Sequence, residues 1–285
     1  MKVLITGASG ILGSSIFKIM DSAGHDVIGF NSSQININNF NDVQEKTLAF
    51  QPDIIIHCAA LTDVEQAEKS PELCYQVNYT GTLNFVNAAK LANAKFIYIS
   101  STGCYGSHKE IPYAEYDDVM PPTVHHRSKF VGERVVAENH PEHLIVRTGW
   151  LFGGTIAHKK NFVYNRYLEA KSNSKITSDP FQTGTPTSVT EVAQQLLVLI
   201  EKKVCGTYNI VSEGSCTRYE YVDYIVKQFG LDCEVVKAEK PYTRIAPVSK
   251  NEAAENFNLK AMGLSIMSHW QHSLSQYINE LKNYV

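Results

Sequence analysis

The fold of this chain is decided by KVLITGASGILG, the stretch of residues 2–13. Its first five residues are an apolar run that predicts a short buried strand, and Gly7, Gly10 and Gly13 follow with G-x-x-G-x-x-G spacing. An amphipathic segment, residues 14–23, then predicts a helix. Glycines at this spacing allow a tight turn, a close approach to a pyrophosphate and a helix packed on the sheet, while the helix offers free N–H groups to phosphate. We predict a dinucleotide-binding turn rather than a plain turn.

Further apolar segments follow at the rhythm of an α/β protein, at residues 26–30, 53–58, 95–100 and 143–147. Helical patterns separate them, among them residues 72–92. Strands that are apolar throughout and alternate with helices indicate a parallel sheet covered on both faces. We therefore expect an α/β fold with a Rossmann-type doubly wound parallel sheet. Ligands of such sheets bind beyond the carboxyl ends of the strands, where this chain carries residues 7–13, 58–61, 100–102 and 148–150.

The composition excludes several classes of protein. The 285 residues are 44% hydrophobic and 19% charged, with a net charge of -3, which gives no electrostatic reason to bind nucleic acid or an anionic membrane. No apolar run reaches the roughly 20 residues that span a bilayer, and the chain opens on a predicted strand, so we expect no signal peptide and a cytoplasmic protein. The six cysteines form no C-x-x-C pair, which argues against a zinc site or other metal site and against a disulfide framework.

The end of the second predicted strand bears on the choice between NAD and NADP. An acidic residue there hydrogen-bonds the adenine ribose and favours NAD. This chain has Asn31 and Ser32 instead, followed by Ser33. Small neutral groups leave room for a 2′-phosphate, although no arginine stands beside them to hold it. We predict either cofactor, with a mild preference for NADP.

Several motifs in register connect the chain with a known family. They are residues 57–68 (HCAALTDVEQAE), 77–82 (VNYTGT), 100–102 (SST), 128–133 (SKFVGE), 146–153 (VRTGWLFG), 161–163 (NFV) and 179–187 (DPFQTGTPT). With the glycine turn, they resemble the extended short-chain dehydrogenase/reductases, and among these the dTDP-4-dehydrorhamnose reductase branch. The resemblance spans most of the chain and implies a nucleotide-diphosphate sugar as ligand.

The resemblance also implies a division of the chain. Residues 1–153 would be mainly the dinucleotide-binding Rossmann domain and residues 154–285 mainly a smaller α/β substrate lobe, with residues 189–203 returning to the first domain. In the later part, periodicity predicts helices at residues 161–170, 189–201, 219–229 and 268–282 and a strand at residues 207–211. In relatives, two helices corresponding to residues 72–92 and 123–139 pair across a two-fold axis, so a homodimer is expected.

In such enzymes a tyrosine protonates the substrate carbonyl as hydride arrives, a lysine four residues later binds the nicotinamide ribose, and a hydroxyl polarises the carbonyl. By position Thr102 matches the hydroxyl and Lys129 the lysine, while His125 occupies the place of the tyrosine. Residues 125 and 129 lie one helical turn apart and share a face. The predicted catalytic residues are therefore Thr102, His125 and Lys129.

Three interpretations of His125 remain open. Histidine with a pKa near 6.5 is a competent acid at neutral pH, although Lys129 would lower that pKa by repulsion. Another group could supply the proton, with Tyr105, His126 and Tyr113 as candidates. The third interpretation is a protein that has lost catalysis and kept its pocket, through evolution or through an engineered substitution.

Two departures from the reductase pattern leave the sugar open. Residues 103–106 (GCYG) resemble the ending seen in sugar epimerases and dehydratases, and Ala246-Pro247 stands where an R-P pair is expected. We predict NAD(P)H-dependent reduction of a nucleotide-linked 4-keto-6-deoxy sugar, in deoxysugar and surface-polysaccharide biosynthesis. The alternatives are another reaction of this family on a nucleotide sugar, such as epimerisation or dehydration, and a catalytically silent protein.

The predicted binding residues form two sets. The cofactor set is Gly7, Ser9, Gly10, Ile11, Leu12, Asn31, Ser32, Cys58, Ala59, Ala60, Ser100 and Lys129. The substrate set is Thr102, Gly103, Tyr105, Trp150, Asn161, Gln182 and Arg218. A diphosphate also needs cations, and those available in the later part of the chain are Lys159, Lys160, Arg166, Arg218 and Arg244.

Overall fold

Six parallel strands form the central sheet of the computed structural model, which describes all residues 1–285. The order across the sheet is β10-β5-β4-β3-β1-β2, made of β1 (Lys2–Thr6), β2 (Asp26–Phe30), β3 (Ile54–His57), β4 (Lys95–Ser101), β5 (His143–Thr148) and β10 (Gly206–Asn209). The chain runs from β1 outward to β2 and then crosses back to β3. The switch point of this doubly wound sheet, where such folds bind ligands, therefore lies between β1 and β3.

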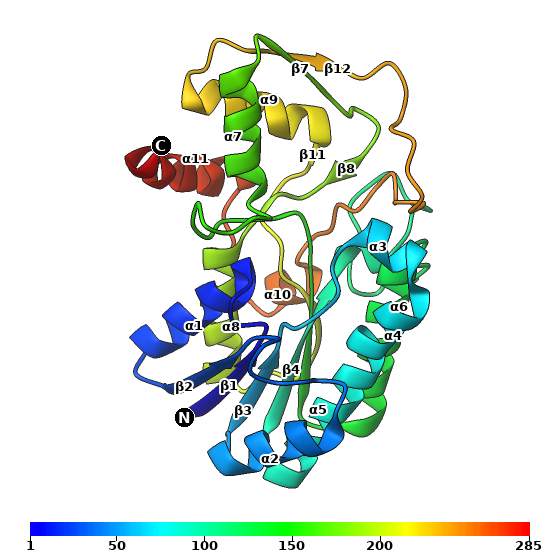
Figure 1. Ribbon diagram of the computed structural model, residues 1–285, viewed down its shortest axis with the longest axis vertical. Helices are drawn as coiled ribbons and strands as arrows, with labels where there is room; N and C mark the ends of the chain where they lie inside the picture. Colours follow the sequence, from blue (N-terminus) through cyan, green and yellow to red (C-terminus); the bar gives the residue numbers. More distant parts are fainter.

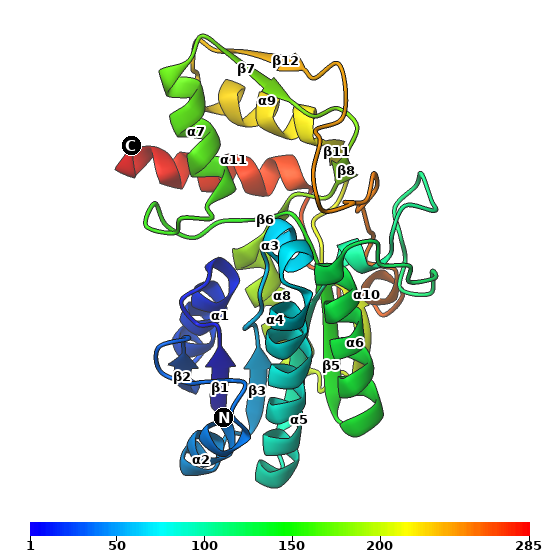
Figure 2. The same cartoon turned by 45° about the vertical axis from the view of Figure 1, so that its right-hand side comes forward.

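Helices cover both faces of the sheet, as the apolar strands predict (Figures 1 and 2). On one face lie α1 (Ile11–Ser22) and α8 (Val189–Glu201), which pack on each other and on the apolar side chains of one large core. The other face carries α2 (Phe40–Phe50), α5 (Gly81–Ala92) and α6 (Val124–Asn139), with a second core between them and the sheet. The predicted α/β fold with a doubly wound parallel sheet is confirmed.

The helix predicted at residues 72–92 is interrupted. It consists of α4 (Pro71–Tyr75), a π-helical turn η1 (Gln76–Thr80) and α5, and it follows the short α3 (Val64–Lys69). The amphipathic pattern crosses the interruption, so the sequence predicted one helix. A π-helical turn inserts an extra residue and re-aims the side chains on it, often at a functional site. The buried side chain on η1 is Asn78.

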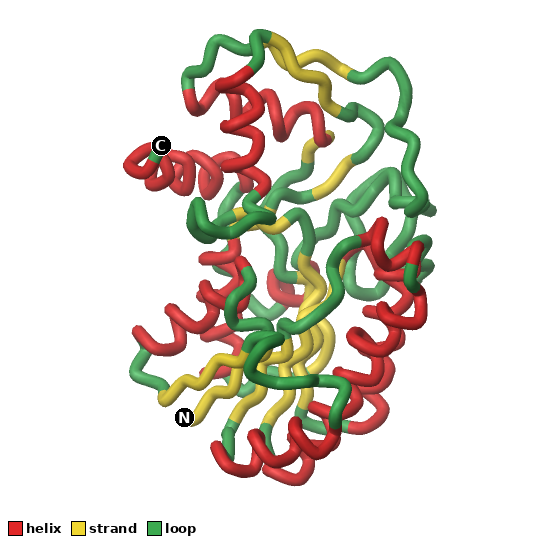
Figure 3. The backbone as a smooth tube through the Cα atoms, in the orientation of Figure 1, coloured by secondary structure: helices red, strands yellow, loops and turns green.

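The later part of the chain forms a smaller layer beyond the carboxyl ends of the sheet (Figure 3). Its helices are α7 (Phe162–Ser172), α9 (Arg218–Phe229) and α11 (Trp270–Leu281), which share an apolar cluster around Tyr221 and Trp270. Three short strand pairs complete it: β6 (Leu151–Phe152) with β9 (Thr187–Ser188), β7 (Lys175–Ser178) with β12 (Glu234–Lys237), and β8 (Thr183–Gly184) with β11 (Cys216–Thr217).

Two segments of the later sequence lie with the sheet instead. Helix α8 packs on α1, and the strand expected at residues 207–211 is β10, which pairs with β5 at the edge of the main sheet. The remaining elements are α10 (Phe257–Ala261), which packs near β10, and the 3₁₀ turns η2 (Thr102–Cys104) and η3 (Lys282–Tyr284). None of the helices combines the length and apolarity that crossing a membrane requires.

Candidate active site

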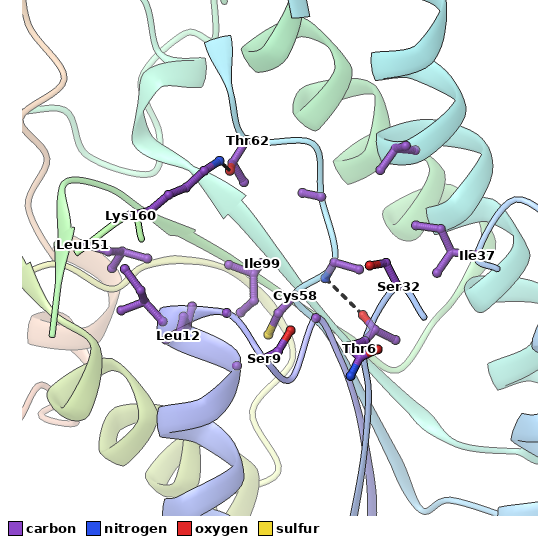
Figure 4. Close-up of a pocket in the computed structure, with 18 of the residues that line it drawn as sticks. Thr6, Ser9, Leu12, Ser32, Ile37, Cys58, Thr62, Ile99, Leu151 and Lys160 are labelled. Atoms are coloured by element: carbon purple, nitrogen blue, oxygen red, sulfur yellow. Dashed lines mark hydrogen bonds between the residues drawn. The ribbon is translucent and has the colours of Figure 1, made fainter. Parts of the chain in front are cut away.

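A cavity of about 1120 Å³ opens at the carboxyl ends of the strands. The loops that follow β1, β2, β3, β4 and β5 line it, together with α6 and residues 157–160 of the later chain. Figure 4 shows Ser9, Cys58 and Thr6 gathered where the loops after β1 and β3 meet. The cavity therefore lies at the switch point of the sheet, where a doubly wound fold binds its ligand.

The glycine turn leaves no room for side chains. Gly7 has φ +64°, and a Cβ there would lie 2.9 Å from the backbone nitrogen of Ala59. A Cβ on Gly13 would lie 2.2 Å from the carbonyl oxygen of Gly7, so α1 packs directly on the turn. Helix α1 begins at Ile11 after Gly10, with no side chain capping its first N–H groups. A bare backbone at a helix N-terminus fits the pyrophosphate of a dinucleotide.

The end of the cavity beside β2 is neutral. Asn31 and Ser32 line it with residues 35–38, and no charged side chain belongs to this stretch of the wall. The Asn31 side chain is already occupied, because its Oδ1 accepts hydrogen bonds from the backbone and side chain of Ser33. Such a wall offers neither a carboxylate for a ribose 2′-hydroxyl nor a cation for a 2′-phosphate.

Lys129 lies on α6 and is almost fully buried. Its Nζ stands 4.0 Å from the centre of the Tyr98 ring and forms no ion pair with a carboxylate. Burial lowers the pKa of Lys129 to about 8. An ammonium group that lines the cavity without an anionic partner is available to ligand hydroxyl groups.

His125 lies one turn before Lys129, in the first turn of α6, and it is 7% exposed. Its Nδ1 is 2.9 Å from the carbonyl oxygen of Leu61. A carbonyl only accepts hydrogen bonds, so Nδ1 carries the proton and Nε2 is the ring nitrogen left for other partners. Burial lowers the pKa of His125 to about 3, and the nearby His126 and Lys129 act in the same direction. At neutral pH the ring is therefore uncharged, with Nε2 as an acceptor.

One turn further along α6, Glu133 holds the end of β4 in place. Its carboxylate pairs with Arg147 of β5 at 2.7 Å and accepts a hydrogen bond of 2.5 Å from Ser100 of β4. All three side chains are buried. Removing one partner of such a pair leaves an uncompensated buried charge, so the pair is costly to separate. The network therefore holds α6 against β4 and β5, the two strands whose ends carry this part of the cavity wall.

Thr102, the predicted polarising hydroxyl, lies just behind the cavity wall. It is 1% exposed, and a Cβ on the wall residue Gly149 would lie 2.3 Å from its Oγ1. Its neighbour Ser101 does line the cavity, and its Oγ accepts a hydrogen bond from the backbone of Gly103. Ser101 is not among the predicted site residues, although two hydroxyls in a row at a strand end were a signal for it.

The alternative proton donors are not brought to the cavity. Tyr105 is fully buried, stacked on Tyr113 at 4.9 Å, and donates its hydroxyl proton to Asn209. Burial raises the pKa of Tyr105 to about 12. His126 packs on Gly103 and does not line the cavity, and burial lowers its pKa to about 4.

Trp150 is the member of the predicted substrate set that lines the cavity directly. It has φ +46°, and its Nε1 donates to Glu252 at 2.9 Å. The guanidinium carbon of Arg218 lies 3.4 Å from the centre of the indole, and burial lowers the pKa of Arg218 to about 10. Arg218 therefore stands behind Trp150. The backbone N–H of Arg218 donates to the carbonyl oxygen of Gln182, and Gln182 does not line the cavity.

Asn161 has a different place from the one expected. It is fully buried as the N-cap of α7, where its Oδ1 accepts from the backbone of Tyr164. Its Nδ2 donates to the carbonyl of Thr155 and to the hydroxyl of Tyr277. Asn161 does not line the cavity; it fastens the base of the loop that does.

That loop brings three further basic residues to the cavity: His158, Lys159 and Lys160. The Nζ of Lys160 donates to the hydroxyl of Thr62 at 2.9 Å, across the mouth of the cavity (Figure 4). His158 and Thr62 are not among the predicted site residues; the signal for His158 was its position beside two lysines.

Comparison with known proteins gives one consistent result. Residues 1–283 match the family model described as the RmlD substrate binding domain. A dTDP-4-dehydrorhamnose reductase of Mycobacterium tuberculosis is 31% identical over 96% of this chain and 91% of its own. The structure of a dTDP-4-dehydrorhamnose reductase from Clostridium acetobutylicum superposes with a TM-score of 0.95 at 31% identity, covering 99% of this chain and 100% of that one. The dTDP-4-dehydrorhamnose reductase of Bacillus anthracis, solved in complex with NADP, gives 0.93 at 31% identity, covering 98% and 99%.

Proposed function

This chain belongs to the RmlD substrate binding domain family, and we propose that it reduces the 4-keto group of a dTDP-linked 6-deoxy sugar for a surface polysaccharide. It is a dTDP-4-dehydrorhamnose reductase-like nucleotide-sugar oxidoreductase. One observation carries the proposal: His125 and Lys129 lie one helical turn apart on a cavity that also includes the glycine turn after β1.

The cofactor of this enzyme is a nicotinamide dinucleotide, and we propose NADPH with NADH also accepted. The free N–H groups of α1 would hold the pyrophosphate, and Lys129 would bind the nicotinamide ribose. The Bacillus anthracis relative binds NADP. The neutral wall at Ser32 supports only weak discrimination between the two. When bound, the reduced nicotinamide supplies a hydride.

The chain's own residues would manage the proton. The Thr102 hydroxyl would donate a hydrogen bond to the carbonyl oxygen, and His125 would deliver a proton from Nε2 to that oxygen. The ring keeps its Nδ1–H on Leu61 in both protonation states and regains the Nε2 proton from solvent. Because the ring is uncharged at neutral pH, few molecules carry the reactive proton at any moment. This favours a slow enzyme, and a catalytically silent protein is the second candidate function.

The substrate would lie between Trp150 and the loop that carries Lys159 and Lys160, whose ammonium groups supply charge for a diphosphate. Arg218 would support Trp150 from behind. We further propose that residues 1–153 serve mainly the cofactor and residues 154–285 mainly the sugar nucleotide, with 189–203 returning to the first part. A homodimer through α5 and α6 completes the proposal, and sedimentation equilibrium tests it.

The decisive experiment compares this chain with His125→Tyr, measuring oxidation of NADPH and NADH by a dTDP-linked 4-keto-6-deoxy sugar. Turnover by the unmodified chain means that histidine suffices as the acid. Turnover only by His125→Tyr means an intact reductase site silenced at one residue. If both variants bind the cofactor and neither turns over, the reductase proposal fails.

A further inference from the structure

The π-helical turn η1 carries a buried amide that reaches toward the site. Asn78 is fully buried, and its side chain makes two contacts with a single peptide segment. Its Oδ1 accepts from the backbone nitrogen of Leu61 at 2.8 Å, and its Nδ2 donates to the carbonyl oxygen of Leu61 at 3.2 Å. Both backbone polar groups of Leu61 are thereby held by one side chain.

The same carbonyl oxygen is the acceptor for His125 Nδ1, at 2.9 Å. Asn78 also donates to the Ser128 hydroxyl at 2.8 Å, and that hydroxyl donates to the backbone oxygen of His125 at 2.7 Å. Asn78 therefore connects to His125 by two routes, one to its ring and one to its backbone. The first route contacts the ring at Nδ1, and the second contacts the turn of α6 that carries it.

We propose that Asn78 is a positioning residue that holds the Leu61 carbonyl in place, fixes His125 as the Nδ1–H tautomer and so leaves Nε2 as its proton-exchanging atom. The tautomer follows from the hydrogen bonds alone, and its catalytic consequence rests on the proposed reductase function. The π-helical turn has a role in this arrangement, because it sets the direction of Asn78 between α4 and α5.

The chain contains a matched control for the Asn78 contact. Asn256 is also fully buried, and it holds Val211 in the same two-point manner. The Val211 nitrogen donates to Asn256 Oδ1 at 2.9 Å, and Asn256 Nδ2 donates to the Val211 oxygen at 2.7 Å. Neither Asn256 nor Val211 lines the cavity. Asn256→Leu therefore reproduces the loss of a buried amide clamp without touching the site.

The first measurement is ¹⁵N NMR of the unmodified chain with ¹⁵N-labelled histidine, using His125→Gln to assign the resonances. We expect a protonated Nδ1 and an unprotonated Nε2 for His125 at pH 7. An Nε2–H tautomer, or an even mixture of the two, would overturn the proposal. This measurement needs no substrate, and the tautomer itself is read from the unmodified chain.

The second measurement compares Asn78→Leu with Asn256→Leu. Asn78→Leu is expected to give a mixed tautomer and a kcat at least about tenfold lower, because small misplacements of a catalytic group are costly. Asn256→Leu should leave the His125 resonances unchanged. In a His125→Tyr background the Asn78 effect on kcat should shrink, since a tyrosine ring has no nitrogen in the place of Nδ1 and no tautomer to be fixed. An unchanged tautomer in Asn78→Leu would refute the inference, whereas a confirmed tautomer without any turnover would refute only the proposed reductase function.

Discussion

At the scale of single residues, the protonation of His125 determines how the reaction depends on pH. Burial lowers its pKa to about 3, and the groups that face it, His126, Lys129 and Lys160, all add repulsion to a positive charge. The reactive imidazolium therefore becomes rarer as pH rises above 3. We expect kcat/KM for reduction to fall about tenfold for each pH unit between 5.5 and 7.5, as for an acid far above its pKa. The profile of His125→Tyr should be flat there, and a flat profile for the unmodified chain would exclude His125 as the acid.

Two neighbouring hydroxyls compete for the polarising role, and substitution separates them. Thr102→Val keeps the shape of the side chain against Gly149 but removes its donor. If Thr102 polarises the carbonyl, kcat should fall by about 10² or more, as when an oxyanion donor is lost. Ser101→Ala should change kcat only a few-fold. The opposite result would assign the role to Ser101, which lines the cavity. Single-turnover kinetics with saturating NADPH are the suitable measurement.

At the scale of elements, the N-terminus of α7 couples helix stability to the basic loop over the cavity. Asn161 caps α7 and holds the loop through Thr155, with Tyr277 as its second partner. Asn161→Ala removes a cap worth about 1 kcal/mol and further hydrogen bonds worth about 1 kcal/mol. We expect a free energy of unfolding about 2 kcal/mol lower, by urea denaturation, and a KM for the sugar nucleotide several-fold higher.

The control for this prediction is Asn39→Ala, which removes the N-cap of α2 at a residue that does not line the cavity. It should lower the free energy of unfolding by about 1 kcal/mol and leave the KM for the sugar nucleotide unchanged. If Asn161→Ala also leaves this KM unchanged, the loop of Lys159 and Lys160 does not contact the substrate.

Elements with a strong periodic pattern could be predicted, and those set by local chemistry could not. Strand β2 and helix α8 have the predicted bounds, because apolar residues mark them clearly. The bounds of helix α2 could not be predicted, because its N-cap Asn39 and its first residues lie within residues 31–41, an Asn- and Ser-rich segment typical of a loop. The π-helical turn η1 was missed because the apolar pattern continues through it.

The residues of the candidate site also fall into those that the sequence could predict and those that it could not. Every residue of the predicted cofactor set lines the cavity, because the glycine turn and the strand ends determine where those residues lie. The substrate set depends on side-chain directions in the later layer, which motif positions do not give. Tyr105 points into a buried stack, Asn161 is a helix cap, and only Trp150 reaches the cavity directly. The Nδ1 hydrogen bond of His125 to Leu61 required the fold itself, since 64 residues separate the partners.

At the scale of the whole molecule, buried histidines make the fold sensitive to acid. Burial lowers the pKa of His57 and His125 to about 3 and of His126 to about 4. In the unfolded chain these groups titrate near pH 6.5. As pH falls below about 6.5, the unfolded state therefore binds protons that the folded state cannot accept, and the free energy of unfolding decreases. Each residue contributes up to about 1.4 kcal/mol per pH unit once its unfolded form is mostly protonated, so the three together cost about 5 kcal/mol between pH 6.5 and 5.

This loss is comparable with the entire stability of many domains, about 5–15 kcal/mol, so we expect the chain to be marginally stable at pH 5. Urea denaturation at pH 5.0, 6.0 and 7.5 measures the slope. His57 suits a test variant because it is fully buried among aromatic rings and lies outside the cavity wall, with Nε2 unpartnered. His57→Gln keeps a polar group near Thr6 and removes one of the three titrating sites, so the slope below pH 6.5 should decrease by about a third. If His57→Gln leaves the dependence of the free energy of unfolding on pH unchanged, His57 is protonated in the folded state. If the free energy of unfolding of the unmodified chain falls as pH rises through this range, the three histidines are not held uncharged by burial.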